Sequence, residues 1–226
     1  MPGGGIQGFA DKALWEFYAR CYDAIAVLQP YQQMLADVIA EVPTRPAPRR
    51  VLDAGCGTGN LTQALLVTRP DVGEVVAADR SVAMLRRSQR KNPTATHVQA
   101  DLNGNLGELA GSFDLILCAN VVYALANPRH SLTILKSRLA PGGRLVVTTP
   151  KARADTKKIV LQHIRAQGVA SLRRLVLPLM VVAVINARIV RTAAYHFLNG
   201  DQVREFLGID AVRLTYSDQV WLGVCY

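Results

Sequence analysis

The sequence predicts an α/β fold with a doubly wound, mostly parallel, seven-stranded sheet that ends in a C-terminal antiparallel hairpin. Strand-type runs alternate with helical runs between residues 51 and 150, which is the pattern of right-handed crossover units in a parallel sheet. The strands are apolar throughout, as burial on both faces requires. Near the end of the chain two strand-type runs are separated by a tight turn, and a connection that short is antiparallel.

The chain begins with two predicted helices. Apolar residues recur at helical spacing over 9–29 and 31–42, and Pro30 is expected to divide the two helices. The stretch PTRPAPRR at 43–50 is a linker, because its prolines prevent a helix. We therefore expect residues 1–48 to form an N-terminal helical cap.

The sheet core is expected over 49–150 and is followed by three further parts. Its strands are predicted at 51–55, 74–79, 95–101, 113–119 and 142–150, and its helices at 61–67, 82–91 and 130–140. Residues 151–199 are predicted to form a helical lid inserted between strands five and six. The segment 200–226 is expected to hold a final helix at 200–209 and a hairpin of strands 211–217 and 219–226, turning at Ser217 and Asp218.

Length and composition indicate one folded domain over residues 1–226, since half of the residues are apolar. The four cysteines are far apart and none forms a CxxC pair, which favours buried free thiols in a reducing compartment and no metal site. The first residues lack the basic start and apolar core of a secretion signal, and no apolar run is long enough to span a bilayer. A cytoplasmic location is the expectation.

The net charge of +9 is concentrated in one segment. Residues 1–150 hold 15 Lys and Arg against 12 Asp and Glu, whereas residues 151–195 hold nine Lys and Arg against Asp155 alone. This segment is either a solvated basic face or a surface that meets phosphate, carboxylate or anionic lipid.

A glycine-rich turn follows the first strand of the sheet, in the stretch VLDAGCGTGN at 51–60. The spacing is G-x-G-x-G, and Asn60 stands where the dinucleotide fingerprint requires its last glycine. Such a turn presents bare backbone to a ligand at the carboxyl end of a strand. Asp53 precedes the turn, and its carboxylate would repel a pyrophosphate and attract an ammonium group.

Two more carboxylates end the next two predicted strands. Asp79 is placed to accept hydrogen bonds from the hydroxyls of a ribose, and Asp101 to accept one from the exocyclic amine of an adenine. Each has a plain structural alternative, because Asp79 can cap the helix that begins at Ser81 and Asp101 can be a turn residue. Together with Asp53 they indicate a ligand with an adenosine at one end, a cationic amino acid at the other and no phosphate, which describes S-adenosylmethionine.

The chain resembles the Rossmann-like (class I) SAM-dependent methyltransferases, in particular the small-molecule methyltransferase type 11, or UbiE-like, group. The resemblance covers residues 50–150 through VLDAGCGTGN, AADRSVAMLRRS, the QADL step, FDLILCANVVYAL and LKSRLAPGGRLVVTTP. It implies S-adenosylmethionine as cofactor. The residues that it assigns to the cofactor are Tyr22, Asp53, Ala54, Gly55, Cys56, Gly57, Asn60, Asp79, Arg80, Met84, Asp101, Leu102 and Asn120.

The loop after the fourth strand narrows the choice of acceptor. Methyltransferases that modify the exocyclic nitrogens of nucleic-acid bases carry (Asp/Asn)-Pro-Pro-(Tyr/Phe) there, whereas this chain has Asn120-Val121-Val122-Tyr123. No DNA partner is expected. Tyr123 is a candidate wall of the acceptor pocket, although helical packing explains it equally well.

Few side chains are candidate bases. His163 and His196 lie in the predicted lid and are the candidate catalytic residues together with Tyr123. His97 lies in a strand and His130 opens a helix, which favours structural roles for both. Methyl transfer is an in-line displacement in which positioning supplies much of the rate, so a general base is needed only for an acceptor of high pKa.

The segment 175–190, LVLPLMVVAVINARIV, is apolar on every side of a helix and is bracketed by arginines within 173–191. It is too short to span a membrane. Three interpretations remain: a buried helix, a homodimer interface, or a surface for a greasy substrate or for peripheral contact with a bilayer.

The sequence favours methyl transfer from S-adenosylmethionine to a small or medium, rather apolar metabolite, which could be lipid-like or a secondary-metabolite intermediate. One alternative is an RNA or protein methyltransferase that uses the basic 151–195 segment, which lacks interleaved aromatic residues. A second is a protein that binds the cofactor without turnover. A nicotinamide enzyme ranks third, because the G-x-G-x-G spacing and the terminal hairpin disfavour it.

Overall fold

The structure is a computed structural model of the chain. It describes residues 22–104, 106, 109–152, 155–173, 175–190 and 195–226. Most of the first predicted helix lies outside the described residues.

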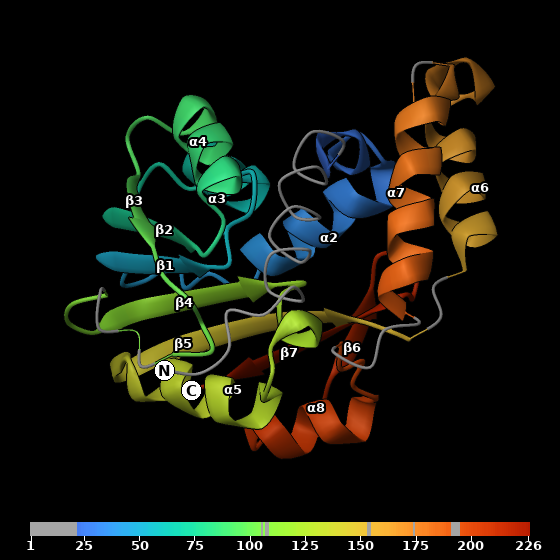
Figure 1. The fold of residues 1–226 in the computed structure, drawn as a ribbon. Coiled ribbons are helices and arrows are strands. Elements are labelled where there is room, and N and C mark those ends of the chain that lie inside the picture. Colours follow the sequence, from blue (N-terminus) through green and yellow to red (C-terminus); the bar gives the residue numbers. More distant parts are fainter. Residues whose placement is uncertain (1–21, 105, 107–108, 153–154, 174, 191–194) are drawn as a thin grey trace, which may run out of the picture.

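The sheet has seven strands in the order β3-β2-β1-β4-β5-β7-β6. β7 is antiparallel to both of its neighbours, and the other pairs are parallel (Figure 1). This confirms the doubly wound, mostly parallel sheet with a C-terminal hairpin. The strands are β1 (Arg50–Ala54), β2 (Glu74–Asp79), β3 (Thr96–Gln99), β4 (Phe113–Ala119), β5 (Leu139–Pro150), β6 (Arg213–Thr215) and β7 (Val220–Cys225).

Helices cover both faces of the sheet (Figure 1). One face carries α2 (Gln29–Ile39), α3 (Asn60–Thr68) and α4 (Val82–Lys91), and the other carries α5 (Pro128–Ser137) and α8 (Gly200–Leu207). The segment between β5 and β6 begins with α6 (Thr156–Gln167), the short 3₁₀ helix η2 (Val169–Leu172) and α7 (Val176–Val190). α6 packs against α2, so this segment and the N-terminal helices lie together.

Alternate side chains of the central strands fill two hydrophobic cores, one on each face. Val51, Leu115 and Leu117 belong to the core beneath α2 and α3, whereas Leu52 and Ile116 belong to the core beneath α5 and α8. Successive residues of a strand point to opposite faces. Both sets are apolar because both faces are covered.

The boundary between the N-terminal helices differs from the expectation. Residues 22–26 are helical, the chain turns at Val27 and Leu28, and Pro30 lies in the first turn of α2. A proline is accommodated there because the first amides of a helix have no intrahelical acceptor. Pro30 therefore opens the second helix rather than separating the two.

The turn of the terminal hairpin is longer than expected. It spans residues 216–219, and the amide of Gln219 donates to the carbonyl of Tyr216 at 3.1 Å. Tyr216, Ser217 and Asp218 all have φ between +55° and +63°. Positive φ is uncommon for residues other than glycine, so sequence signals do not point to it.

Two strand boundaries also move. β3 ends at Gln99, so Asp101 lies in the loop beyond it. β5 begins at Leu139 rather than at residue 142, because Phe113 pairs with Leu139 before the register shifts at an irregularity.

No helix in the described part of the chain is both long enough and apolar enough to cross a bilayer.

The central strand offers a test of the two-core arrangement. Leu117 in β4 is fully buried, whereas Val67 on α3 is 76% exposed. Leu117→Ala is expected to lower the free energy of unfolding by about 2–5 kcal/mol through the cavity that it leaves. Val67→Ala is the control, with a change below about 0.5 kcal/mol. Urea denaturation followed by circular dichroism measures both, and equal losses would contradict the arrangement.

Candidate functional site

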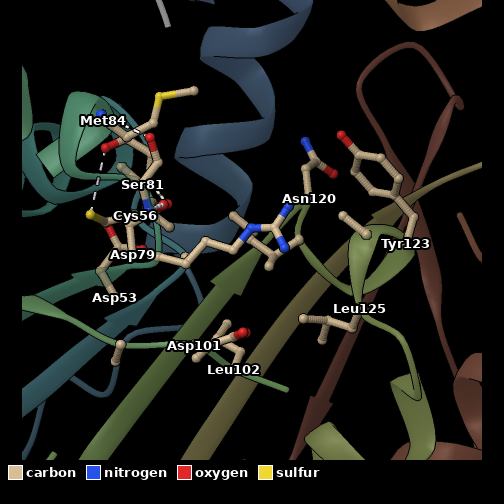
Figure 2. Close-up of a pocket in the computed structure, with 18 of the residues that line it drawn as sticks. Asp53, Cys56, Asp79, Ser81, Met84, Asp101, Leu102, Asn120, Tyr123 and Leu125 are labelled. Atoms are coloured by element: carbon tan, nitrogen blue, oxygen red, sulfur yellow. Dashed lines mark hydrogen bonds between the residues drawn. The ribbon is translucent and has the colours of Figure 1, made fainter. Parts of the chain in front are cut away.

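A cavity opens where β1, β2 and β4 end, next to the point where the strand order reverses from β1 to β4. It encloses about 910 Å³, counted out to open solvent. Ligands of doubly wound sheets bind at this position. In Figure 2, Asp53, Cys56, Asp79 and Met84 lie on one side of the cavity, and Asn120, Tyr123 and Leu125 lie across from them.

The glycine turn after β1 forms one wall. Gly55 has φ +77°, and a Cβ there would lie 2.4 Å from Cγ2 of Val121. Gly57 has φ +55°, but a Cβ built on it meets nothing within 4 Å. Gly55 is therefore required both by conformation and by close packing, whereas Gly57 lines the cavity and leaves room beside its backbone.

Asp79 at the end of β2 joins two turns of the backbone. Its Oδ2 accepts a hydrogen bond from the amide of Gly57 at 2.9 Å, and its Oδ1 accepts one from the amide of Ser81 at 2.8 Å. Burial raises its pKa, and these backbone hydrogen bonds oppose the increase. Ser81, not Asp79, caps α4, because its side chain accepts from the amide of Met84. Capping of α4 therefore does not explain why the Asp79 carboxylate lines the cavity.

Asp53 lies deeper in the cavity. It is buried, and the hydroxyl of Thr62 donates to its Oδ2 at 2.5 Å. Burial raises the pKa of Asp53 to about 6, and the charge of Asp79 adds to the increase. A cation that binds beside it would favour the ionised form.

Asp101 lines the cavity from the loop after β3. Its Oδ1 accepts from the backbone amide and the side-chain amide of Asn103 at 3.0 and 2.8 Å. Asn103 in turn accepts from the amide of Ala126 at 2.7 Å, which ties this loop to the loop after β4. Asn103 also lines the cavity, and the sequence analysis did not identify it. The structure thus brings Asp53, Asp79 and Asp101 to one cavity.

Asn120 begins the opposite wall in a left-handed conformation, with φ +54°. Its amide donates to the carbonyl of Thr148 at 2.9 Å, and the hydroxyl of Thr148 donates to its Oδ1 at 3.2 Å. Its Nδ2 lies 3.2 Å from Sδ of Met34, a fully buried residue of α2. A strained residue held by several partners at a cavity is typical of functional sites.

Tyr123, in the short 3₁₀ helix η1 (Val122–Ala124), contributes an aromatic wall. Its ring stacks on Phe197 at 5.3 Å between centroids, and Tyr195 lies at 6.0 Å. Burial raises the pKa of Tyr123. At neutral pH its phenol is protonated, so it can donate a hydrogen bond but is not suited to remove a proton.

The two candidate histidines do not line the cavity. His163 is buried, where its Nδ1 accepts from the amide of Gln29 at 3.1 Å and its Nε2 lies 3.0 Å from the hydroxyl of Ser171. His196 is exposed, and its backbone amide donates to the carbonyl of Tyr123 at 2.6 Å. His97 bonds to Ser88 at 3.0 Å, which agrees with a structural role.

Most residues assigned to the cofactor line this cavity. They are Tyr22, Asp53, Gly55, Cys56, Gly57, Asp79, Arg80, Met84, Asp101, Leu102 and Asn120. Ala54 and Asn60 do not belong to the lining. Further lining residues that the sequence analysis missed are Tyr31, Leu61, Ser81, Ala100, Asn103, Ala119, Val121, Ala124 and Leu125. Tyr31 comes from α2, and only the packing of that helix over the sheet brings it here.

Three cysteines, Cys56, Cys118 and Cys225, are buried free thiols. Burial raises the pKa of each, and that of Cys118 reaches about 12. These thiols stay protonated at neutral pH. Cys21 lies outside the described residues.

Comparisons with known proteins identify the family of the chain. Residues 28–178 match a family model described as a methyltransferase domain. Among curated relatives, a trans-aconitate 2-methyltransferase of Acidovorax sp. (strain JS42) is 35% identical over 140 residues, which cover 62% of this chain and 51% of the relative. A trans-aconitate 2-methyltransferase of Azoarcus sp. (strain BH72) is 38% identical over 115 residues, covering 51% and 44%. The chain spans about half the length of these relatives.

Solved structures share the fold over most of the chain. The N-methyltransferase NodS of Bradyrhizobium japonicum WM9, in complex with S-adenosyl-L-homocysteine, has a TM-score of 0.59 at 15% identity and covers 87% of each chain. A putative methyltransferase in complex with the Haloferax volcanii activator Trm112 has a TM-score of 0.65 at 15% identity and covers 92% of each. From the family match and the shared fold, the chain belongs to the methyltransferase domain family, as a class I, Rossmann-like member.

Proposed function

We propose that this protein transfers a methyl group from S-adenosylmethionine to a small, rather apolar acceptor. The observation that carries the proposal is one cavity that is lined by three carboxylates and a glycine-rich turn, with the aromatic ring of Tyr123 across from Asp53 and Asp79. S-Adenosylmethionine supplies a methyl group bonded to a positively charged sulfur. The family match to methyltransferase domains supports this chemistry.

The residues present fit this cofactor. Asp53 would hold the ammonium group, Asp79 the ribose hydroxyls and Asp101 the adenine amine. The amides of Gly57 and Ser81 each occupy one lone pair of an Asp79 oxygen, and a carboxylate oxygen can accept two hydrogen bonds, so both oxygens can still accept from the ribose. The open space beside Gly57 leaves room for the amino-acid end.

The acceptor side of the cavity favours a neutral, apolar molecule. Asn120 begins this side, and the rest of it is formed by Val121, Tyr123, Ala124 and Leu125. Among the lining residues that the structure describes, Arg80 is the one cation, and it directly follows Asp79 in the sequence. An anionic acceptor, such as the trans-aconitate named for the curated relatives, needs cations beside its carboxylates. We therefore place this chain's acceptor in a different chemical class.

Positioning is the main contribution of the protein to such a transfer. Asn120 is fixed by Thr148, and the Tyr123 ring is fixed by Phe197. A rigid, partly dry wall can hold the acceptor atom in line with the methyl group. The protonated phenol of Tyr123 can orient an acceptor oxygen or nitrogen by a hydrogen bond.

The exposed face of α7 supports a membrane as the source of the acceptor. Four apolar side chains on this face, which we call the α7 stripe, are between 52% and 72% exposed: Val176, Leu177, Met180 and Val184. They lie within one third of the helix circumference, while Val182 and Ile185 on the other face are buried. An exposed apolar stripe of this kind fits peripheral contact with lipid.

Charge favours an anionic bilayer over a second copy of the chain. Residues 156–200 contain seven Lys and Arg and no Asp or Glu. A symmetric dimer through α7 would bring two such segments together, since both copies use the same surface. Anionic headgroups complement the same cations. We therefore assign the α7 stripe to a lipid surface, with dimerisation as an outcome that the test below detects.

Removing the Asp79 carboxylate tests the cofactor assignment. Asp79→Ala is expected to weaken binding of S-adenosylmethionine by roughly 10- to 100-fold, because hydrogen bonds to a charged group are lost. Asp71→Ala is the control, since Asp71 is an exposed carboxylate that pairs with Arg69 away from the cavity. Isothermal titration calorimetry measures both. Unchanged affinity in Asp79→Ala, or binding of NAD in place of S-adenosylmethionine by the wild type, would contradict the assignment.

The raised pKa of Asp53 predicts the pH dependence of binding. The ammonium of the cofactor binds the ionised carboxylate, so binding below the pKa of about 6 must release a proton. Affinity for S-adenosylmethionine is expected to be constant above about pH 7 and to fall up to about tenfold per pH unit below 6. Asp53→Asn should bind weakly and lose this dependence. A wild-type affinity that does not change between pH 7.5 and 5 would remove Asp53 from the ammonium site.

Vesicle sedimentation tests the α7 stripe. The wild type is expected to sediment with anionic phosphatidylglycerol vesicles at low salt and not with phosphatidylcholine vesicles. Met180→Glu should reduce this binding at least about tenfold, because it places a charge in the apolar contact. Val67→Glu, at an exposed valine of α3, is the control. Absence of vesicle binding, or a concentration-dependent dimer that Met180→Glu dissociates in ultracentrifugation, would overturn the lipid assignment.

A further inference from the structure

We propose that Asp23 is a positioning residue that latches the N-terminal cap onto the glycine turn and so slows the release of S-adenosylmethionine. The inference deepens the proposed function, because it rests on binding of that cofactor in the cavity. Asp23 lies in the helical segment 22–26, before α2.

The carboxylate of Asp23 joins three segments that are distant in the sequence. Its Oδ1 accepts from the hydroxyl of Thr58 at 2.6 Å and from Nζ of Lys91 at 2.7 Å. Its Oδ2 lies 3.7 Å from Nη1 of Arg87. Lys91 also donates to Oδ1 of Asn60. The cap is thereby tied to the glycine turn, to the first residue of α3 and to the end of α4.

The Thr58 end of this contact lies in the glycine turn, directly after Gly57, which lines the cavity. Thr58 is fully buried and stands between Gly57 and Gly59, both of which have positive φ. The adjacent amide of Gly57 donates to Asp79. Two carboxylates, Asp23 and Asp79, therefore hold the same short turn, and a movement of either is passed to the backbone that faces the cofactor.

The Asp23 end of the contact belongs to a wall of the cavity. Tyr22, its neighbour in the chain, lines the cavity and forms a side-chain hydrogen bond with Tyr31 of α2, which also lines it. Displacement of the segment 22–26 moves Tyr22 out of the wall. The Asp23 contacts must break in that movement, so they oppose the opening of the cavity on this side.

A second carboxylate of the N-terminal helices provides a matched control. Asp37 on α2 accepts from the hydroxyl of Thr215 and lies 3.8 Å from Nη1 of Arg213. It has the same kinds of partner as Asp23, a threonine hydroxyl and a basic side chain. Apart from Gln33 on α2 itself, these partners belong to β6, and neither they nor Asp37 line the cavity. Substitution of either Asp23 or Asp37 should weaken the packing of the N-terminal helices. Of the two, only Asp23 contacts the glycine turn, so only its substitution should affect cofactor release.

Stopped-flow measurement of cofactor release tests the latch. The dissociation rate of S-adenosylmethionine is measured in the wild-type chain, Asp23→Asn, Lys91→Met, the double variant and Asp37→Asn. Asp23→Asn is expected to raise the rate about five- to tenfold, with a comparable loss of affinity. Lys91→Met should have a similar effect, and the double variant should add little, because both variants remove one shared contact. Asp37→Asn should release the cofactor at the wild-type rate.

The outcomes separate this inference from the proposed function. Equal dissociation rates in wild type and Asp23→Asn, or equal increases in Asp23→Asn and Asp37→Asn, would overturn the latch and leave the cofactor assignment intact. A wild-type chain that does not bind S-adenosylmethionine overturns both. If Asp23→Asn does not fold, Lys91→Met at the end of α4 decides the result alone, and restoration of the wild-type rate by Asp23→Glu supports a charge-dependent contact.

Discussion

The carboxylate of Asp79 connects the two turns on which the cavity depends. It accepts hydrogen bonds from the amides of Gly57 and Ser81, one after β1 and one after β2. Those turns end neighbouring parallel strands, so their separation is set by the sheet register. The glycine turn thereby stays open beside Gly57, and α4 begins at a fixed place with its own Ser81 cap. The sheet register sets the distance between the two turns, and the Asp79 carboxylate holds their backbones in a fixed arrangement at this wall of the cavity.

Charge is divided in a way that matches the proposed chemistry. Three carboxylates line the cavity, while the excess of cations over carboxylates lies mainly in 151–195, which holds nine Lys and Arg against one Asp. An acidic cavity suits a cationic cofactor, and it disfavours an anionic acceptor near the same carboxylates. The basic segment lies in sequence around the apolar α7 stripe. The proposals for the cofactor site, the acceptor and the lipid contact therefore rest on the same distribution of charge.

Local signals in the sequence were sufficient for the regular elements. The helix at 82–91 has the predicted bounds, because Ser81 is a strong cap and an apolar period follows it. The parallel pairing of β1 to β5 follows from the alternation of strands and helices, whereas the order of the strands in the sheet was not predicted. Pro30 was misjudged because a proline that opens a helix and one that ends a helix look alike without tertiary structure. Tyr216 and Ser217 have positive φ although neither is glycine, so the sequence contains no residue that marks this turn conformation.

The sequence predicted those site residues that lie within short sequence motifs. The strand-end carboxylates and the glycine turn lie within short motifs, whereas Tyr31, Asn103 and Leu125 reach the cavity through packing between distant segments. The apolar helix α7 was predicted, but the sequence did not show which face of it is exposed, because both faces are apolar. The contact of Asp23 with Thr58 joins residues 35 positions apart. No spacing rule predicts a contact of that kind.

A crystal structure of the chain with S-adenosyl-L-homocysteine tests the central claim most directly. The account predicts the ribose hydroxyls at hydrogen-bond distance from the Asp79 carboxylate, the amino group beside Asp53 and the sulfur facing Asn120. A molecule bound at any other surface, or bound in this cavity with its ribose away from Asp79, would contradict the account.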